Sequence, residues 1–167
     1  VSGTIIKVDW GSSNDPVSQT FHVNLGAPET VPDFQTRFTG LNRTTYEELY
    51  EQGNQLKNHA DVYNALARLF SVGENVIVVH DFRGDIEAIR YSWQERHIGS
   101  AQPLAPRATI VDTALLLLGQ YAERTSLVDA VRNVLRFSGT FRAIGNHNPL
   151  EDALATLCIG IKFLAGD

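Results

Sequence analysis

The chain has 167 residues, of which 43% are hydrophobic and 20% charged, so it is long and apolar enough to bury a sizeable core. Its net charge of −5 excludes a broad basic surface as the source of affinity for nucleic acid, although an acidic enzyme can hold a short single strand in a small cleft. The single cysteine, Cys158, excludes an internal disulfide or a cysteine-based zinc site, and we expect it to be a buried, inert thiol.

The sequence shows no signal peptide and no apolar run of membrane length. We therefore expect an intracellular protein, cytoplasmic or nuclear, without a membrane partner. The sequence also contains no methionine, not even at its first position. This leads us to expect that the chain begins after a processing event or is a piece of a longer protein.

The first third of the chain is typical of a β-hairpin followed by a short helix. Thr4–Trp10 and Ser18–Leu25 have the composition of strands, and the turn formers between them predict an antiparallel pair. Further along, Thr45 and Glu48 have the spacing of a capping box. We therefore expect Thr45 or its neighbour Thr44 to cap a short helix.

The middle of the chain alternates helices with short apolar strands. Val76–Val79 is an uninterrupted β-branched run, which suits a central strand buried on both faces, and Thr109–Val111 is a second short strand. A helix precedes the first strand over Asn58–Phe70, and another begins after it at Asp85. The side chains that we expect on the inner faces of these helices are Val62, Leu66, Leu69, Phe70, Ile86, Ile89 and Trp93.

The last third is helical. Leu115–Leu118 predicts a helix or a 3₁₀ turn, and Ser126–Phe137 predicts a helix with Ser126 as its cap. Pro149 suits the first turn of a closing helix, where its missing N–H costs nothing. The residues that we expect on the inner face of that helix recur at helical spacing: Leu150, Ala153, Leu154, Leu157, Ile161 and Leu164.

An antiparallel start followed by alternating strands and helices indicates an α/β fold. We expect a mixed sheet with helices on its faces, in a single domain of residues 1–167. In such folds, functional sites lie beyond the carboxyl ends of the strands. That rule directs attention to the polar residues that follow the two apolar strands.

Three acids fall at such positions, and one histidine lies near them in the sequence. Asp85 follows the first apolar strand, Asp112 follows the second, and Asp152 opens the closing helix just after His147. Carboxylates that share Mg²⁺ or Mn²⁺ can polarise a phosphate, while an imidazole takes a proton from water. Simpler roles stay open, with Asp85 and Asp152 as charges at helix N-termini and Asp112 as a turn or cap. Asp81 is an alternative to Asp85 in the same loop.

Two segments resemble motifs of the DnaQ-like, DEDD-type 3′–5′ exonucleases, which share the ribonuclease H-like fold. Val78–Ile89 (VVHDFRGDIEAI) resembles the second motif, and the resemblance implies that Asp85 is a metal ligand. His147–Leu157 (HNPLEDALATL) resembles the third motif of the histidine subgroup. That resemblance implies that His147 is the general base and Asp152 a metal ligand.

Two further segments have the order that this family shows. Ile110–Leu117 (IVDTALLL) resembles an Ile-Asp-Thr segment of the fold, and Thr20–Asn42 resembles its third strand and the segment after it. The resemblance thus covers nearly the whole chain. It implies a ribonuclease H-like mixed sheet, with an antiparallel hairpin first, then parallel strands, and helices on both faces.

The family's first motif, an Asp-x-Glu at the end of the first strand, has no counterpart at an early strand here. The only early candidate is Asp9-Trp10-Gly11, whose third residue is glycine. We therefore align Thr4–Trp10 with the family's second strand and expect the first strand and its acids to lie upstream of Val1. Either that segment has been removed from this chain, or the domain has lost catalysis, because two-metal hydrolysis needs those carboxylates.

Two functions follow from these observations. The first is a 3′–5′ exonuclease that acts on a 3′ end of RNA or single-stranded DNA with Mg²⁺ or Mn²⁺, inactive in this chain if the first acidic motif is lacking. The alternative is a non-catalytic module of the same fold that binds a protein partner or nucleic acid. An unrelated nucleotide-binding domain ranks last, because no strand leads into a G-x-G-x-x-G loop.

Overall fold

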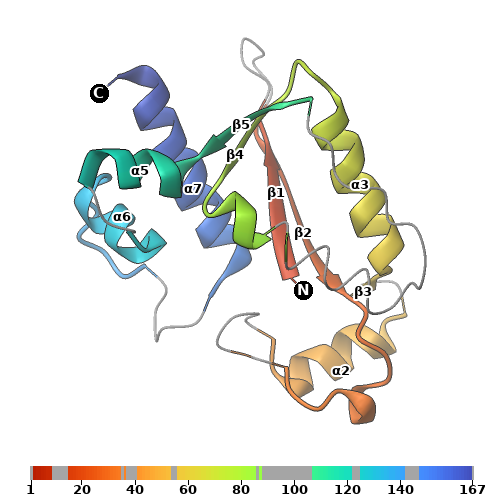
Figure 1. Ribbon diagram of the computed structural model, residues 1–167. Helices are drawn as coiled ribbons and strands as arrows, with labels where there is room; N and C mark the ends of the chain where they lie inside the picture. Colours follow the sequence, from red (N-terminus) through yellow and green to blue (C-terminus); the bar gives the residue numbers. More distant parts are fainter. Residues whose placement is uncertain are drawn as a thin grey trace. The chain divides into compact units, whose positions relative to one another are not determined.

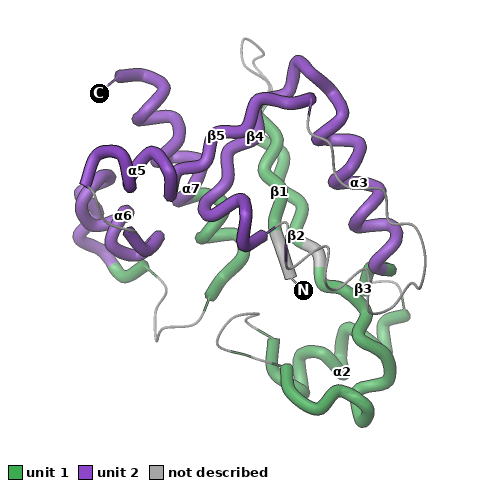
Figure 2. The backbone as a smooth tube through the Cα atoms, in the orientation of Figure 1, with its two compact units in different colours: residues 1–58, 140–154 green, residues 59–139, 155–167 purple. Residues whose placement is uncertain are grey.

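The computed structural model divides the chain into two compact units (Figures 1 and 2). Unit 1 comprises Val1–Asn58 and Thr140–Leu154, and unit 2 comprises His59–Gly139 and Ala155–Asp167. We describe each unit by itself. The structure describes residues 2–8, 15–34, 36, 41–53, 56–85, 87, 107–121, 125–141 and 147–166.

Unit 1 contains a sheet of three strands in the order β1-β2-β3. Strand β1 (Ser2–Lys7) pairs antiparallel with β2 (Val17–Val23), and β3 (Leu56–Lys57) pairs parallel with β2. The hydroxyl groups of Thr4 and Thr20, which are partners in the register, lie 2.8 Å apart. The predicted hairpin is therefore confirmed, while Asp9 and Trp10 at the end of its first predicted strand, and residues 11–14 of its turn, lie outside the described residues.

In the segment of unit 1 that follows β2, the core forms around Tyr46, which is fully buried in the helix α2 (Arg43–Glu51). Its hydroxyl group accepts from the N–H of Leu25 at 2.7 Å and donates to the carbonyl of Gly26 at 2.9 Å. These bonds satisfy a buried polar group, as a tyrosine in a core requires. The core around this ring consists of Val31, Phe34, Leu41 and Tyr46, beside the 3₁₀ helix η1 (Pro28–Thr30).

The predicted threonine cap of α2 is wrong. The cap is Asn42, whose Oδ1 accepts from the N–H of Thr45 at 2.9 Å. Asparagine is among the strongest N-cap residues, so the helix begins earlier than the capping-box spacing indicated. Thr44 and Thr45 accordingly lie inside the helix.

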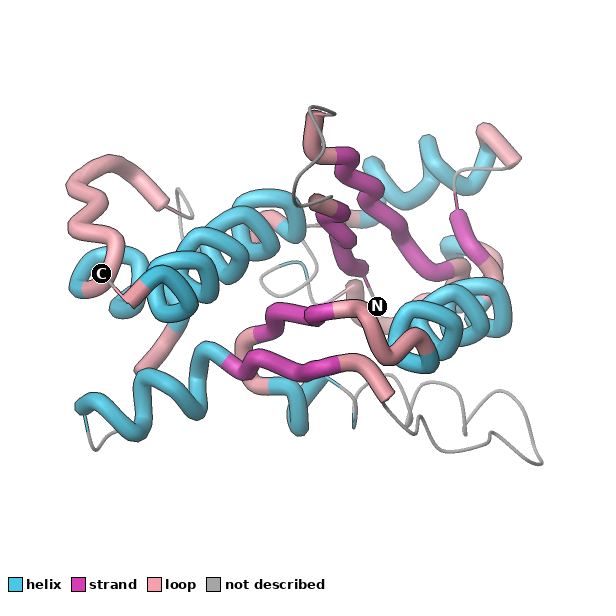
Figure 3. Tube along the Cα trace, turned by 90° about the horizontal axis from the view of Figure 1, so that it is seen from above, coloured by secondary structure: helices cyan, strands magenta, loops and turns pink. Residues whose placement is uncertain are grey.

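Unit 2 is an α/β unit with a two-stranded parallel sheet. Strands β4 (Val76–Val79) and β5 (Thr109–Asp112) pair in parallel, and Figure 3 shows the strands of both units from above. Val76 is 52% exposed, so the prediction that this strand is buried on both faces is wrong within the described part of the chain. In the described part of unit 2, the helices with defined bounds are α3 (His59–Ser71), α5 (Thr113–Tyr121), α6 (Leu127–Asn133) and the C-terminal part of α7 (Pro149–Ala165).

The predicted helices before β4 and after β5 are confirmed, with different ends, while most of the helix predicted from Asp85 lies outside the described residues. Helix α3 begins at His59 and buries Tyr63 and Phe70, while the carbonyl of Phe70 accepts from the N–H groups of Arg107 and Ala108 at 2.8 and 3.0 Å. Those bonds attach the end of α3 to the start of β5. Ser126 caps α6 as predicted, but the helix ends at Asn133, before the predicted Phe137. The predicted positions Ile86, Ile89 and Trp93 lie outside the described residues.

Helix α7 begins at Pro149 as predicted, but the predicted inner face is wrong. Its buried residues are Ala155, Thr156, Ile159 and Gly160, while the leucines Leu150, Leu154 and Leu164 are exposed. The reason is close backbone packing against β4. A Cβ at Gly160 would lie 2.4 Å from Cγ1 of Val78, so only glycine allows this approach. Because this face of α7 packs against β4, Cys158 lies on an exposed face of the helix. The prediction of a buried thiol is therefore wrong.

Replacing Gly160 by alanine tests this packing. We expect Gly160→Ala to lower the free energy of unfolding by about 1 kcal/mol net, because overpacking costs about 1–3 kcal/mol and alanine returns about 1 kcal/mol of helix propensity. The matched control is Gly119→Ala in α5, where no heavy atom lies within 4 Å of the new Cβ, so that variant should be more stable. Urea unfolding of both variants measures these changes in the free energy of unfolding. Equal stabilisation by both substitutions would contradict the close packing of Gly160 against Val78.

Candidate functional site

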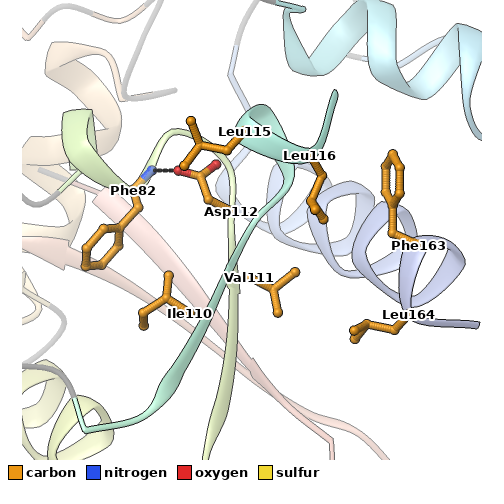
Figure 4. Close-up of a pocket in the computed structure, with 8 residues that line it drawn as sticks. All are labelled: Phe82, Ile110, Val111, Asp112, Leu115, Leu116, Phe163 and Leu164. Atoms are coloured by element: carbon orange, nitrogen blue, oxygen red, sulfur yellow. Dashed lines mark hydrogen bonds between the residues drawn. The ribbon is translucent and has the colours of Figure 1, made fainter. Parts of the chain in front are cut away.

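The carboxylate of Asp112 joins the end of β5 to the loop that follows β4. Its Oδ1 accepts from the N–H groups of Asp81 at 3.0 Å and Ala114 at 2.9 Å, and its Oδ2 accepts from the N–H of Phe82 at 2.8 Å (Figure 4). Three backbone donors thus converge on one side chain. Of the two roles that the sequence left open for Asp112, the structure supports the turn and cap role.

The loop after β4 turns sharply at Asp81, whose φ of 69° lies in the left-handed region. Aspartate is one of the few side chains that tolerate this conformation. The carboxylate of Asp81 lies over Gly84, where a Cβ would meet its Oδ2 at 2.9 Å. The loop therefore holds Asp81 just ahead of the helical residues 82–85.

His80 and Thr113 form a hydrogen-bonded pair that sequence reasoning missed. The hydroxyl of Thr113, which is fully buried, donates to the carbonyl of Val79 at 3.0 Å and lies 2.9 Å from Nδ1 of His80. Because the hydroxyl has one proton and donates it to Val79, Nδ1 of His80 must be the protonated nitrogen in this bond. In the sequence, the only sign of this pair was that a polar residue, Thr113, follows Asp112.

Asp85 lies among negative charges at this end of the sheet. Desolvation, followed by the charges of Asp81 and Asp112, raises the pKa of Asp85 to about 6. Asp85 is nevertheless exposed on its surface, so solvent reaches the residue although its carboxyl group is partly desolvated. The sequence predicted that Asp85, Asp112 and Asp152 share a site. The structure brings Asp85 near Asp112 and near Asp81, the alternative acid of the same loop.

The start of α7, in unit 1, carries the second candidate group. Nδ1 of His147 lies 3.1 Å from Oδ2 of Asp152, and their side chains are 32% and 20% exposed. Asn148 caps the helix, because its Oδ1 accepts from the N–H groups of Leu150 and Glu151 at 3.0 and 3.3 Å. This cap, which sequence reasoning missed, positions His147 next to the first turn of the helix.

The structure thus brings His147 together with Asp152 in unit 1, and Asp85 together with Asp81 and Asp112 in unit 2. Grouping of Asp85 with Asp152 stays a prediction. Within the described residues, no three side chains of histidine, cysteine, aspartate or glutamate are grouped so that they could hold a metal ion.

An Asp-x-Glu spacing does occur once, at Asp85 and Glu87, but it follows β4 rather than an early strand. The carboxylate of Glu87 accepts from Nε of Arg83 at 3.0 Å, in an exposed pair one helical turn apart. Such pairs are ordinary features of helix surfaces. This occurrence therefore does not supply the missing first motif.

Comparison of the chain with models of protein families, with curated proteins and with solved structures found no match. In the described part of the chain, no helix has the combination of length and apolar composition that crossing a membrane requires.

Removing the carboxylate of Asp112 should disrupt the end of the parallel sheet. We expect Asp112→Ala to lower the free energy of unfolding by about 2–4 kcal/mol, because three backbone N–H groups lose a charged acceptor. The control is Glu74→Ala in the exposed turn before β4, which should change stability by less than about 0.5 kcal/mol. A loss no larger than that of the control would contradict the role of Asp112.

The raised pKa of Asp85 predicts a specific dependence of stability on pH. Because the folded pKa of about 6 lies above the ordinary aspartate value of 3.8, folding favours the protonated form. This contribution is complete below about pH 4 and is lost as the pH rises through 6. We therefore expect Asp85→Asn to stabilise the protein more at pH 7 than at pH 4, in chemical unfolding at both values. A difference that is independent of pH would contradict the crowding of Asp85.

Proposed function

We propose that this chain is a 3′–5′ exonuclease-type domain that acts on RNA or single-stranded DNA by metal-assisted phosphodiester hydrolysis. The observation that carries the proposal is the 3.1 Å contact between His147 and Asp152 at the start of α7. These two residues belong to the segment that resembles the third motif of the histidine-type DEDD exonucleases. Such a substrate would be met in the cytoplasm or the nucleus.

The geometry of the pair suits proton transfer. A carboxylate beside one ring nitrogen orients an imidazole, so that its other nitrogen can face the reacting water. His147 is half-buried and precedes the capped end of a helix, so its position is set by the backbone. Its role in the proposal is to take a proton from the water that attacks the phosphodiester.

Asp85 and Asp152 are the proposed metal ligands. Carboxylate oxygens are the ligands that Mg²⁺ and Mn²⁺ prefer. The pKa of Asp85 is raised by desolvation first and then by the charges of Asp81 and Asp112, and a cation would offset those charges. A bound cation would polarise the phosphate and offset its charge. The chemistry of the donors fits such an ion, although no complete ligand set is grouped within the described residues.

One alternative has an observation in its favour, namely a non-catalytic module of the same fold that binds protein or nucleic acid. The oxygens of Asp112 accept from three backbone N–H groups, so this acid serves the fold. No Asp-x-Glu follows an early strand either. A domain whose acids at these positions are absent, or already bound to backbone N–H groups, keeps a binding surface. It loses most of its ability to stabilise negative charge at a phosphate.

Trimming of a 3′ end separates the two functions. We expect the protein, in a form that includes the first acidic motif, to shorten a single strand labelled at its 5′ end from the 3′ end when Mn²⁺ is present and not when it is chelated. Removing a general base typically costs about 10²–10⁴-fold in rate, so His147→Ala should lose at least about 100-fold, and Asp85→Asn and Asp152→Asn should be inactive.

The matched control is Glu151→Gln, which alters the carboxyl group next to Asp152 in the same turn of α7 and should keep the full rate. Each variant is compared at equal folded fraction, judged by circular dichroism. Binding of the single strand without Mn²⁺-dependent trimming would overturn the exonuclease and leave the binding module.

A further inference from the structure

Arg83 places a positive charge among the acids at the end of the parallel sheet in unit 2. Its backbone directly follows Asp81 and Phe82, whose N–H groups donate to the carboxylate of Asp112 at 3.0 and 2.8 Å. Asp85, a proposed metal ligand, comes two residues later in the same helical turn. The anchored loop therefore sets where Arg83 leaves the backbone.

The guanidinium group of Arg83 is held at one nitrogen. Its Nε donates to Oε1 of Glu87 at 3.0 Å, and the side chain is 88% exposed. In the described part of the chain, Nη1 and Nη2 make no hydrogen bond or ion pair. The N–H donors of these two nitrogens thus face solvent in a planar fork, which is the geometry that binds two oxygens of one phosphate.

The bond to Glu87 orients the side chain but is weak. Exposed ion pairs one helical turn apart contribute little to stability, so a phosphate can replace this carboxylate easily. The pKa of Arg83 is raised chiefly by the hydrogen bond to Glu87 and by its charge, with a smaller effect from the charge of Asp81. Asp81 is therefore close enough for its charge to act on the guanidinium group.

The surrounding acids make a cation at this position necessary for binding a phosphodiester. The charges of Asp81 and Asp112 act on Asp85, and the whole chain has a net charge of −5. A phosphate that approaches Asp85 is repelled by these carboxylates. Arginine side chains and metal ions commonly share the task of offsetting charge on a phosphate.

We propose that Arg83 is a substrate-binding residue that holds a backbone phosphate of a single strand next to Asp85. The phosphate takes the place of Glu87 on the guanidinium group. This inference rests on the proposed function and extends it, because a contact to phosphate fixes the position of a strand without reading its bases. Replacement of Arg83 should therefore weaken strands of different base sequence by the same factor.

Binding of a labelled single strand tests the contact, in the form of the protein used for the trimming assay. The titrations use the slow His147→Ala background with Mn²⁺, with and without Arg83→Gln, at equal folded fraction. We expect Arg83→Gln to weaken binding about tenfold, because a charge-assisted contact is lost. The slope of log K against log salt concentration should become shallower by about 0.7, which corresponds to one phosphate contact.

The matched control is Arg68→Gln, which removes the same charge from the exposed surface of α3 in unit 2. Nε of Arg68 donates to the carbonyl of Asn64 at 3.2 Å, so this side chain also makes one bond through Nε. Arg68→Gln should keep the parent affinity. Mn²⁺ affinity should not fall in Arg83→Gln, since loss of a positive charge does not weaken cation binding, whereas damage to the loop would lower it.

The outcomes separate this contact from the proposed hydrolysis. Equal affinities of Arg83→Gln and Arg68→Gln, or a loss that depends on base sequence, would overturn the contact and leave the trimming assay to decide the hydrolysis. Binding without trimming would overturn the hydrolysis, and the comparison of the two variants would still decide the contact. Failure of the parent to bind any single strand would overturn both.

Discussion

The carboxylate of Asp112 is the interaction on which the polar end of unit 2 depends. It gathers N–H groups from the loop after β4 and from the first turn of α5, residues that are about 30 positions apart along the chain. The hydroxyl of Thr113, the next residue, bonds to the carbonyl of Val79 and to His80 at the start of the same loop. The bond to the N–H of Asp81 holds that acid near Asp112, and the charges of both acids add to the desolvation that raises the pKa of Asp85.

Local sequence patterns predicted many of the strands and helix starts. They did not predict where the backbones of two elements pack closely together. The paired strands, the parallel strands and the starts of α6 and α7 follow from alternation, β-branched runs and cap residues. The inner face of α7 did not follow, because hydrophobic spacing identifies large side chains, whereas the packing there depends on Gly160 meeting Val78. For the same reason the leucines of that helix and Cys158 were assigned to the wrong face.

The candidate site was predictable where its parts are neighbours in sequence. His147 and Asp152 are five positions apart, so their contact could be expected from one turn of helix and its preceding loop. The partners of Asp112 and the pair of His80 with Thr113 are long-range and depend on the strand register, which no local pattern encodes. The sequence left both a metal-binding role and a structural role open for Asp112. Only the folded structure identifies the structural role.

The proposed function requires that Asp85 and Asp152 hold one cation beside His147. Titration of Mn²⁺, followed by electron paramagnetic resonance, into wild type, Asp85→Asn, Asp152→Asn and the double variant tests it most directly. Ligands of one ion act as a unit, so each single variant should lose most of the affinity and the double variant should lose little more. Losses that simply add, or a single variant that binds Mn²⁺ as wild type does, would contradict the shared site.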